Sequence, residues 1–446
     1  MGSEAHVPVE TGSALHRVLG LAFGLAIGFG GVDGGSLLNT TGSDAGLTPD
    51  PWLIVALWTA CSLHSFLGAN VVAEVMTALP KDGGLFVTAR RAFGDFGGLI
   101  VGWADAAQTC AAIAAVTILF ATFAGMIVPA LVPYGIALAI GVQVFLLGVN
   151  LLGIREGSAV QQATALLKAV MLAAIVMTLL MAAGTGAMAP PTPGTVTIAG
   201  AITAYLLIYG VYSGWAYPGY FGDESKTGGR EIPKAIFGSI AAASFVYIGF
   251  NLGLVAALDM PTLAHSDFPA ADVVGRVIGA DGRLLLVAIA MVVVFSSANA
   301  YILIAPRILY GLGRDGLFFR WSAHVNRGGT PNWSTIVTVA ASIAMTMSGS
   351  FETVFLLMGA MTLFTFVVTD IAYFVLRRRE PELERPFRAW GHPYLPILLL
   401  AIDGALFAAI LWADPFGGMA MLAMIAIAIP ISGLIHFQKR RKRAAA

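Results

Sequence analysis

The chain has 446 residues and no formal net charge; 58% of its residues are hydrophobic and only 11% are charged. Soluble proteins carry about 25% charged residues, so this composition, with a mean hydropathy of +0.82, indicates an integral membrane protein. The balanced charge argues against nucleic acid as a partner. Cys61 and Cys110 both lie in apolar segments and predict no disulfide framework.

Twelve apolar segments match, to within a few residues, the length needed to cross a bilayer, which is about 20 residues per helix. Short connections rich in Pro, Gly and Asp separate them. We therefore expect an all-α membrane protein with twelve transmembrane helices. The segments lie near residues 15–40, 52–77, 97–127, 133–153, 157–183, 199–223, 235–258, 282–310, 333–348, 351–376, 393–413 and 417–437.

The positive charges give an orientation. If the chain starts inside and the spans alternate, 22 of the 25 Lys and Arg residues fall on the inner side. Arg276 and Arg283 fall outside, and Lys168 lies within a span. This positive-inside bias predicts a multi-pass protein of a bacterial-type plasma (inner) membrane with both termini in the cytoplasm.

Two of the apolar segments are interrupted. The first contains "AIGFGGVDGGSLL" (26–38), and the sixth contains glycines and a proline in "YGVYSGWAYPGYFGD" (209–223). Each opens a set of five spans, so the second set must sit inverted relative to the first. The predicted organisation is a cytoplasmic N-terminus (1–14), two inverted repeats (15–183 and 199–376), two further helices (393–437) and a basic cytoplasmic tail (438–446).

Broken helices in a membrane are tolerated only where protein or a wet cavity receives the backbone groups that they free. Near Gly30 and Gly31, free N–H groups favour a carboxylate and free carbonyls favour an ammonium. The same holds for Ser213–Gly214–Trp215. We therefore expect both breaks to bind a small substrate through the backbone, so that a side chain added at Gly30 or Gly214 blocks binding and spares folding. The alternative is that these glycines serve close helix packing.

Several stretches resemble the amino acid–polyamine–organocation (APC) permeases. The strongest are "YSGWAYPGYFGDESKTGGREIPKAI" (212–236) and "SSANAYILIAPRILYGLGRDG" (296–316), and the resemblance covers nearly the whole chain. It implies the inverted-repeat fold with discontinuous first and sixth helices, and transport of an amino acid or amine. The glycine pattern "GLGRDG" follows a membrane span and not a strand, so it is no dinucleotide site. We expect no enzyme activity, no cofactor and no metal.

The resemblance places the substrate-binding residues in the two breaks. Phe29 stands where the family usually has a small hydroxyl residue, and Gly210 stands where amino-acid carriers often have an aromatic gate. Tyr209 or Tyr212 is the candidate replacement for that gate, and a larger pocket is the alternative. The expected substrate-binding set is Gly28, Phe29, Gly30, Gly31, Asp33, Tyr209, Tyr212, Ser213, Gly214 and Trp215.

Asp33 lies outside the family pattern and has two interpretations. It can cap the outer half-helix, where a carboxylate is a favourable partner of the helix dipole. It can also act as the counter-ion of a substrate ammonium, because a carboxylate at that depth needs a partner.

Ionisable residues inside spans are functional candidates. Some proton-coupled family members carry a lysine at the position of Lys168, where sodium-coupled relatives bind a cation between spans one and eight. The resemblance implies that its amine meets span-one carbonyls and Ser297, and that it couples protons to transport. A permanently charged structural lysine is the alternative. We expect structural roles for four further residues, which are His64 (alone on its span), Glu74, Asp370 and Asp403, and leave Asp105 open.

The predicted function is secondary active transport of amino acids or related amines by alternating access, with proton symport as the preferred coupling. One alternative is an exchanger for amines or polyamines that lack a carboxylate. The other is a non-transporting receptor or a partner-dependent subunit with the same fold.

Overall fold

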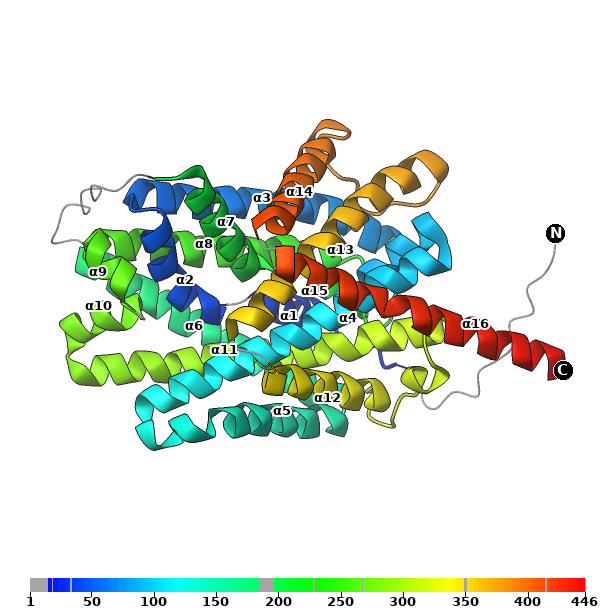
Figure 1. The fold of residues 1–446 in the computed structure, drawn as a ribbon, viewed down its shortest axis with the longest axis horizontal. Helices are drawn as coiled ribbons and strands as arrows, with labels where there is room; N and C mark the ends of the chain where they lie inside the picture. The colour runs from blue at the N-terminus through cyan, green and yellow to red at the C-terminus, as the bar shows by residue number, and fades with distance from the viewer. Residues whose placement is uncertain are drawn as a thin grey trace.

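The computed structural model describes residues 15–17, 19–32, 34–183, 196–227, 229–266, 268–348, 351–413 and 415–445. Most of these residues lie in helices, and the long ones run side by side along the molecule (Figure 1). Within these ranges the only β-type pairing is one isolated parallel bridge between Leu19 and Ser225. The predicted all-α class is confirmed.

The helices follow one another in this order: α1 (Leu21–Gly31), α2 (Gly34–Leu47), α3 (Pro51–Ala78), α4 (Leu85–Ile127), η1 (Pro129–Tyr134), α5 (Gly135–Leu152), α6 (Ile154–Ala183), α7 (Ile198–Tyr212), η2 (Tyr217–Phe221), α8 (Ile232–Ala257), α9 (Met260–His265), α10 (Pro269–Ile278), α11 (Ala280–Arg314), η3 (Arg320–Ala323), α12 (Asn332–Ser348), α13 (Phe351–Arg379), α14 (Tyr394–Ala413), α15 (Pro415–Ala426) and α16 (Ala428–Ala445).

Ten helical segments in the described part of the chain are long and apolar enough to cross a membrane. The other two predicted spans are shorter. The first is split into α1, which has 11 residues, and α2. The ninth corresponds to α12, which has 17 residues. A multi-pass membrane protein is therefore supported, while the count of twelve and the inverted repeat stay predictions.

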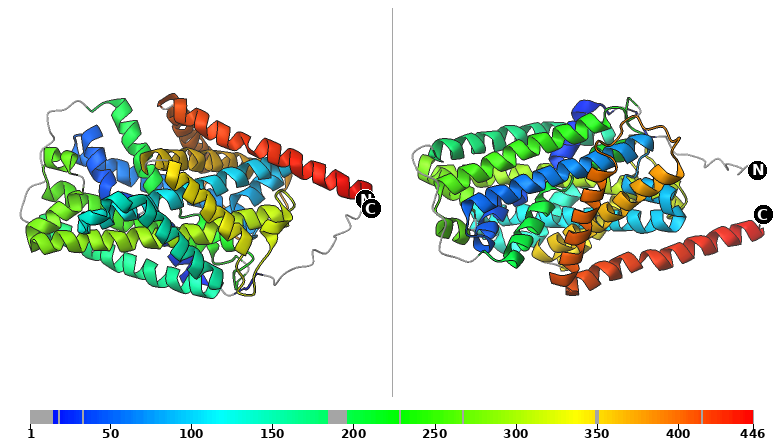
Figure 2. Two further views of the ribbon diagram at one scale, coloured as in Figure 1. Left: turned by 60° about the horizontal axis from the view of Figure 1, so that its bottom comes forward. Right: turned by 90° about the horizontal axis from the view of Figure 1, so that it is seen from above.

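α4 lies at the centre of the bundle, where it packs along α11 and α13. Its alanine-rich middle is buried, and small side chains let neighbouring helices approach closely. Gly94, with φ of 80°, divides α4 into a short first helix and a long second one, which agrees with a third span that begins near residue 97. By contrast, α14, α15 and α16 lie at the periphery of the bundle (Figure 2).

Glu74 joins three parts of the fold at the end of α3. Its carboxylate is 1% exposed and accepts hydrogen bonds from Arg377 Nε of α13 (2.7 Å) and from the Ala389 N–H before α14 (2.7 Å). Arg385 Nε lies 3.0 Å from the same carboxylate. These contacts agree with the structural role expected for Glu74.

Replacing Glu74 with Gln leaves Arg377 and Arg385 without their anion, so we expect the free energy of unfolding to fall by about 3 kcal/mol. Thermal melting of the purified protein in detergent measures this loss. Arg91→Gln is the matched control, because Arg91 is more than half exposed and its pair with Glu380 should contribute less than about 1 kcal/mol. Equal melting temperatures for the two variants would contradict the assignment.

Candidate functional site

The end of α1 is bound by an ammonium group. Lys168, on α6, is 1% exposed, and its Nζ donates to the carbonyl oxygens of Phe29 (3.1 Å), Gly30 (3.2 Å) and Val32 (2.7 Å). It also donates to Ser297 Oγ of α11 at 3.2 Å. A cation suits this position because the carbonyl end of a helix carries partial negative charge. The contacts expected for Lys168 are therefore present, while its coupling role stays a prediction.

Side chains also bind the neighbouring carbonyls of α1. The Gly31 carbonyl accepts from Tyr301 Oη of α11 at 2.9 Å. Gln161 of α6 donates to the Ala26 carbonyl (3.1 Å) and accepts from Asn299 of α11 (2.9 Å). Carbonyls freed by the break thus find partners on α6 and α11, as a break inside a bilayer requires.

The second break lies between α7 and η2. Ser213 Oγ donates to the Gly210 carbonyl (2.7 Å), and the Tyr217 N–H donates to the Gly214 carbonyl (3.1 Å). Gly214 has φ of 107°, a region that side chains disfavour, and a Cβ built on it would collide with the Gly31 carbonyl. The two breaks therefore touch each other, backbone against backbone.

Glycine at the first break is needed for packing in this conformation. A Cβ at Gly30 would collide with the Gln161 amide, and a Cβ at Gly31 would collide with the Tyr217 ring. In this conformation the space beside Gly214 is filled by backbone and the space beside Gly30 by the end of a flexible side chain. The expectation that an added side chain spares folding stays a prediction. The packing interpretation accounts for these contacts.

The aromatic candidates of α7 and the second break point to different neighbours. Tyr212 packs edge-on against Tyr247 of α8, with ring centroids 5.1 Å apart. Trp215 stacks on Phe366 of α13, with ring planes at 9°. Tyr209 stacks on the imidazole of His64 on α3, with ring centroids 5.3 Å apart.

The position of the missing aromatic gate is filled from another helix. A Cβ at Gly210 would lie 3.0 Å from the ring of Phe355 on α13. Phe29 is buried, with its ring centroid 5.4 Å from the ammonium nitrogen of Lys168. Gly28 packs beside Ser239 of α8. Asp33 lies outside the described residues.

Sequence reasoning missed a buried ion pair that joins α11 to the segment after η2. Arg307, expected at the inner surface, is 1% exposed within α11, and its Nε donates to Glu224 Oε1 at 2.7 Å. The backbone of Leu19 pairs with the same segment, since its N–H donates to the Glu224 carbonyl (3.1 Å) and its carbonyl accepts from Lys226 (2.9 Å). Segments before α1 and after η2 are thereby held together.

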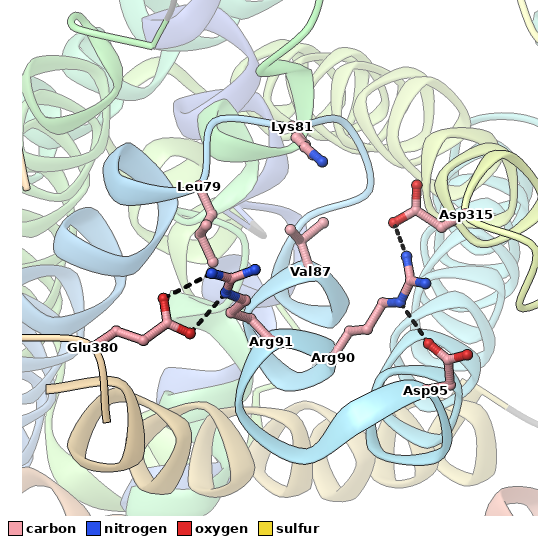
Figure 3. Close-up of a pocket in the computed structure, with 8 residues that line it drawn as sticks. All are labelled: Leu79, Lys81, Val87, Arg90, Arg91, Asp95, Asp315 and Glu380. Atoms are coloured by element: carbon pink, nitrogen blue, oxygen red, sulfur yellow. Dashed lines mark hydrogen bonds and ion pairs between the residues drawn. The ribbon is translucent and has the colours of Figure 1, made fainter. Parts of the chain in front are cut away.

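Charged side chains of α4 and at the ends of α11 and α13 line a cavity of about 520 Å³ (Figure 3). Arg90 lies between Asp95 and Asp315, with hydrogen bonds of 2.8 Å to each, and Arg91 binds both oxygens of Glu380. Next to the lining residue Lys81 in the sequence, burial and the neighbouring carboxylates raise the pKa of Asp82 well above its ordinary value. These charges make the cavity hydrophilic, as an aqueous vestibule would be.

Gly214→Ala should destabilise the protein, because an L-residue with positive φ costs about 1–2 kcal/mol before any collision with Gly31 is counted. We expect a lower melting temperature in detergent and a loss of monodisperse protein. Gly141→Ala in α5 is the control, since its Cβ would meet nothing within 4 Å. A Gly214→Ala variant that melts like the wild type and loses only substrate binding would contradict the packing role and support ligand approach alone.

Comparison with known proteins agrees with this architecture. Residues 15–435 match the sequence model of the amino acid permease family. The chain is 25% identical to the serine/threonine exchanger SteT of Bacillus subtilis (strain 168), over 97% of this chain and 99% of that protein. It is 24% identical to the b(0,+)-type amino acid transporter 1 of Mus musculus, over 95% and 88% of the two chains. It is also 24% identical to the human large neutral amino acids transporter small subunit 2, over 99% and 85%. The chain therefore belongs to the amino acid permease family and is a transporter, not an enzyme.

Proposed function

We propose that the protein is a secondary active transporter of amino acids or related amines, and that it works by proton symport with alternating access around the two breaks. The observation that carries the proposal is the binding of Lys168 Nζ by four oxygens at the end of α1. The proposal includes twelve spans in a 5+5 inverted repeat and two cytoplasmic termini in a bacterial-type plasma membrane.

The chemistry of the Lys168 site supports proton coupling. Three carbonyls and a hydroxyl are a ligand set that suits a monovalent cation, and here the ammonium of α6 supplies the charge. A free ion can travel with the substrate, whereas a tethered ammonium can couple only by losing its proton. A neutral amine has one donor fewer and no charge to offer the carbonyl end of α1. Release of the proton would therefore loosen α1 from α6 and α11.

The breaks themselves support an amino acid as the substrate. An α-amino acid carries both an ammonium and a carboxylate, and a broken helix offers carbonyls to the first and N–H groups to the second. In this conformation Gly31 and Gly214 are in contact. A substrate reaches their backbone only after the two breaks separate, which is the movement that alternating access requires.

Exchange is the second candidate, and one relative favours it by name, the serine/threonine exchanger SteT. If Lys168 keeps its proton throughout, the ammonium only holds α1 in place. Transport would then depend on substrate moving in both directions, without a proton gradient.

Two substitutions of Lys168 separate symport from exchange. In liposomes with an inward proton gradient, the wild type should accumulate amino acid, whereas Lys168→Met should not, because it has no proton to release. Lys168→Arg should also fail to accumulate, since a guanidinium stays protonated at any working pH. Counterflow without a gradient should persist at least in Lys168→Arg, which keeps the charge at the end of α1.

Lys81→Met, at the edge of the polar cavity, is the matched control and should behave like the wild type. Gradient-driven accumulation by Lys168→Arg at the wild-type level would exclude proton release from this site. If the proton gradient does not affect accumulation by the wild type or by any of the three variants, exchange is favoured.

A further inference from the structure

A second buried polar centre lies among α3, α7, α13 and α14. His64 of α3 is 4% exposed, and its Nε2 lies 2.9 Å from Asp403 Oδ1 of α14. Its other ring nitrogen, Nδ1, lies 2.9 Å from Tyr205 Oη of α7. His64 therefore has polar partners on two helices distant in sequence, and the structural role expected for it stays a prediction.

The Asp403 carboxyl has a second acidic neighbour. Asp370 of α13 is 2% exposed, and its carboxyl lies close to that of Asp403. Two carboxyl groups in this contact cannot both be ionised at low cost, so the pair retains a proton. Asp370 Oδ2 is buried with no hydrogen-bond partner among the described atoms. The ion pairs of the described chain bring no lysine or arginine to either carboxyl.

The other groups that face His64 are neutral. The ring of Tyr209 stacks on the imidazole with centroids 5.3 Å apart, and the hydroxyl of Tyr205 binds it at the edge. The Cys61 thiol of α3 lies beside Tyr205. The net charge of the centre therefore depends on the imidazole and on the acid pair alone.

Counting protons gives the two charge states of this centre. With a neutral His64, one carboxylate and one carboxylic acid, the net charge is −1. One more proton on His64 makes the net charge zero. A neutral cluster is favoured in apolar surroundings, because an uncompensated charge inside a membrane is costly. Both ring nitrogens of the imidazole have a polar partner, so the ring is placed to bind that proton.

We propose that His64, Asp403 and Asp370 form an intramembrane proton-binding site, separate from Lys168, that controls the position of α7. A neutral His64 donates from Nε2 to Asp403 and accepts the Tyr205 hydroxyl proton at Nδ1. When a proton from water binds to Nδ1, that nitrogen becomes a donor and the Tyr205 hydroxyl must turn its own hydrogen away. The hydrogen bond between His64 of α3 and Tyr205 of α7 thereby changes direction, and the packing of the two helices changes with it.

The place of α7 connects this site to the breaks. α7 ends at Tyr212, directly before Ser213 and Gly214, and Gly214 touches the end of α1. A shift of α7 relative to α3 therefore moves the second break. The effect on transport depends on the proposed function, whereas proton binding at His64 does not.

Transport by purified protein in liposomes, with equal pH on both sides, tests the control of α7. Across about pH 5–8, the wild-type exchange rate should change about tenfold or more, and His64→Gln should lose most of this change, keeping only the part that Lys168 contributes. Gln can still donate to Asp403, and melting in detergent checks its fold. His324→Gln, at an exposed histidine bound to Asn332, is the control and should keep the wild-type pH profile.

Spectroscopy tests the site without any transport. Infrared spectra of the full-length protein in lipid should contain a carboxylic acid C=O band that Asp370→Asn removes, because Asn imitates the protonated acid. The ring nitrogens of His64 should titrate in nitrogen NMR spectra of the wild type. A wild-type pH profile in a folded His64→Gln, an unchanged infrared band in Asp370→Asn, or a His64 ring that does not titrate would overturn the inference. If the wild type transports no amino acid at any pH, the proposed function fails, and the two spectra still decide this one.

Discussion

The contact between the Lys168 ammonium and the carbonyl end of α1 is the interaction on which the central architecture depends. A helix that stops inside a bilayer leaves carbonyls that water cannot reach, and each needs a donor from the protein. Lys168 satisfies three of them, and Tyr301 satisfies a fourth. Because these donors come from α6 and α11, the break fixes where both helices lie relative to α1. Ser297 and Gln161 extend the same attachment.

The second constraint is the lack of space between the two breaks. Gly214 approaches the Gly31 carbonyl so closely that no side chain fits. On one side of this contact, the pair Arg307–Glu224 and the pairing of Leu19 with the segment after η2 hold the chain together. In this conformation the breaks are therefore in direct contact, and these pairs join the segments that flank them. Passage of a substrate requires both sets of contacts to open.

The sequence predicts the parts of this arrangement that follow from local pattern. Apolar length predicts the spans, and glycine inside an apolar run predicts the breaks. The residues that fill the space beside a glycine are not local. No pattern near Gly210 predicts Phe355, and none near Gly30 predicts Gln161, so the sequence does not show which side chains fill the space beside these glycines. The partners of Lys168 followed from family resemblance and not from periodicity.

The same limit explains the ion pairs. His64 and Asp403 are 339 residues apart, and Arg307 and Glu224 are 83 residues apart. No pattern in the sequence therefore indicates which residues form a pair. A solitary ionisable residue in a span signals only that a partner must exist. The positive-inside rule placed Arg307 at the inner surface because it uses only the position of each Lys or Arg along the chain. It does not consider whether the residue has a buried ion-pair partner.

The two polar centres hold different half-helices. The Lys168 centre attaches α1 to α6 and α11 through carbonyl oxygens, which only accept hydrogen bonds, so its strength depends on the charge of the amine. The His64 centre attaches α7 to α3 and α14 through an imidazole and the Tyr205 hydroxyl, each of which can donate or accept a hydrogen bond. A proton added to Nδ1 therefore reverses the direction of the hydrogen bond to Tyr205 and does not remove it. Under the two proposals, loss of a proton at the first centre releases α1, whereas gain of one at the second rearranges the contact of α7. Because Gly31 and Gly214 touch, either change alters the contact between the breaks.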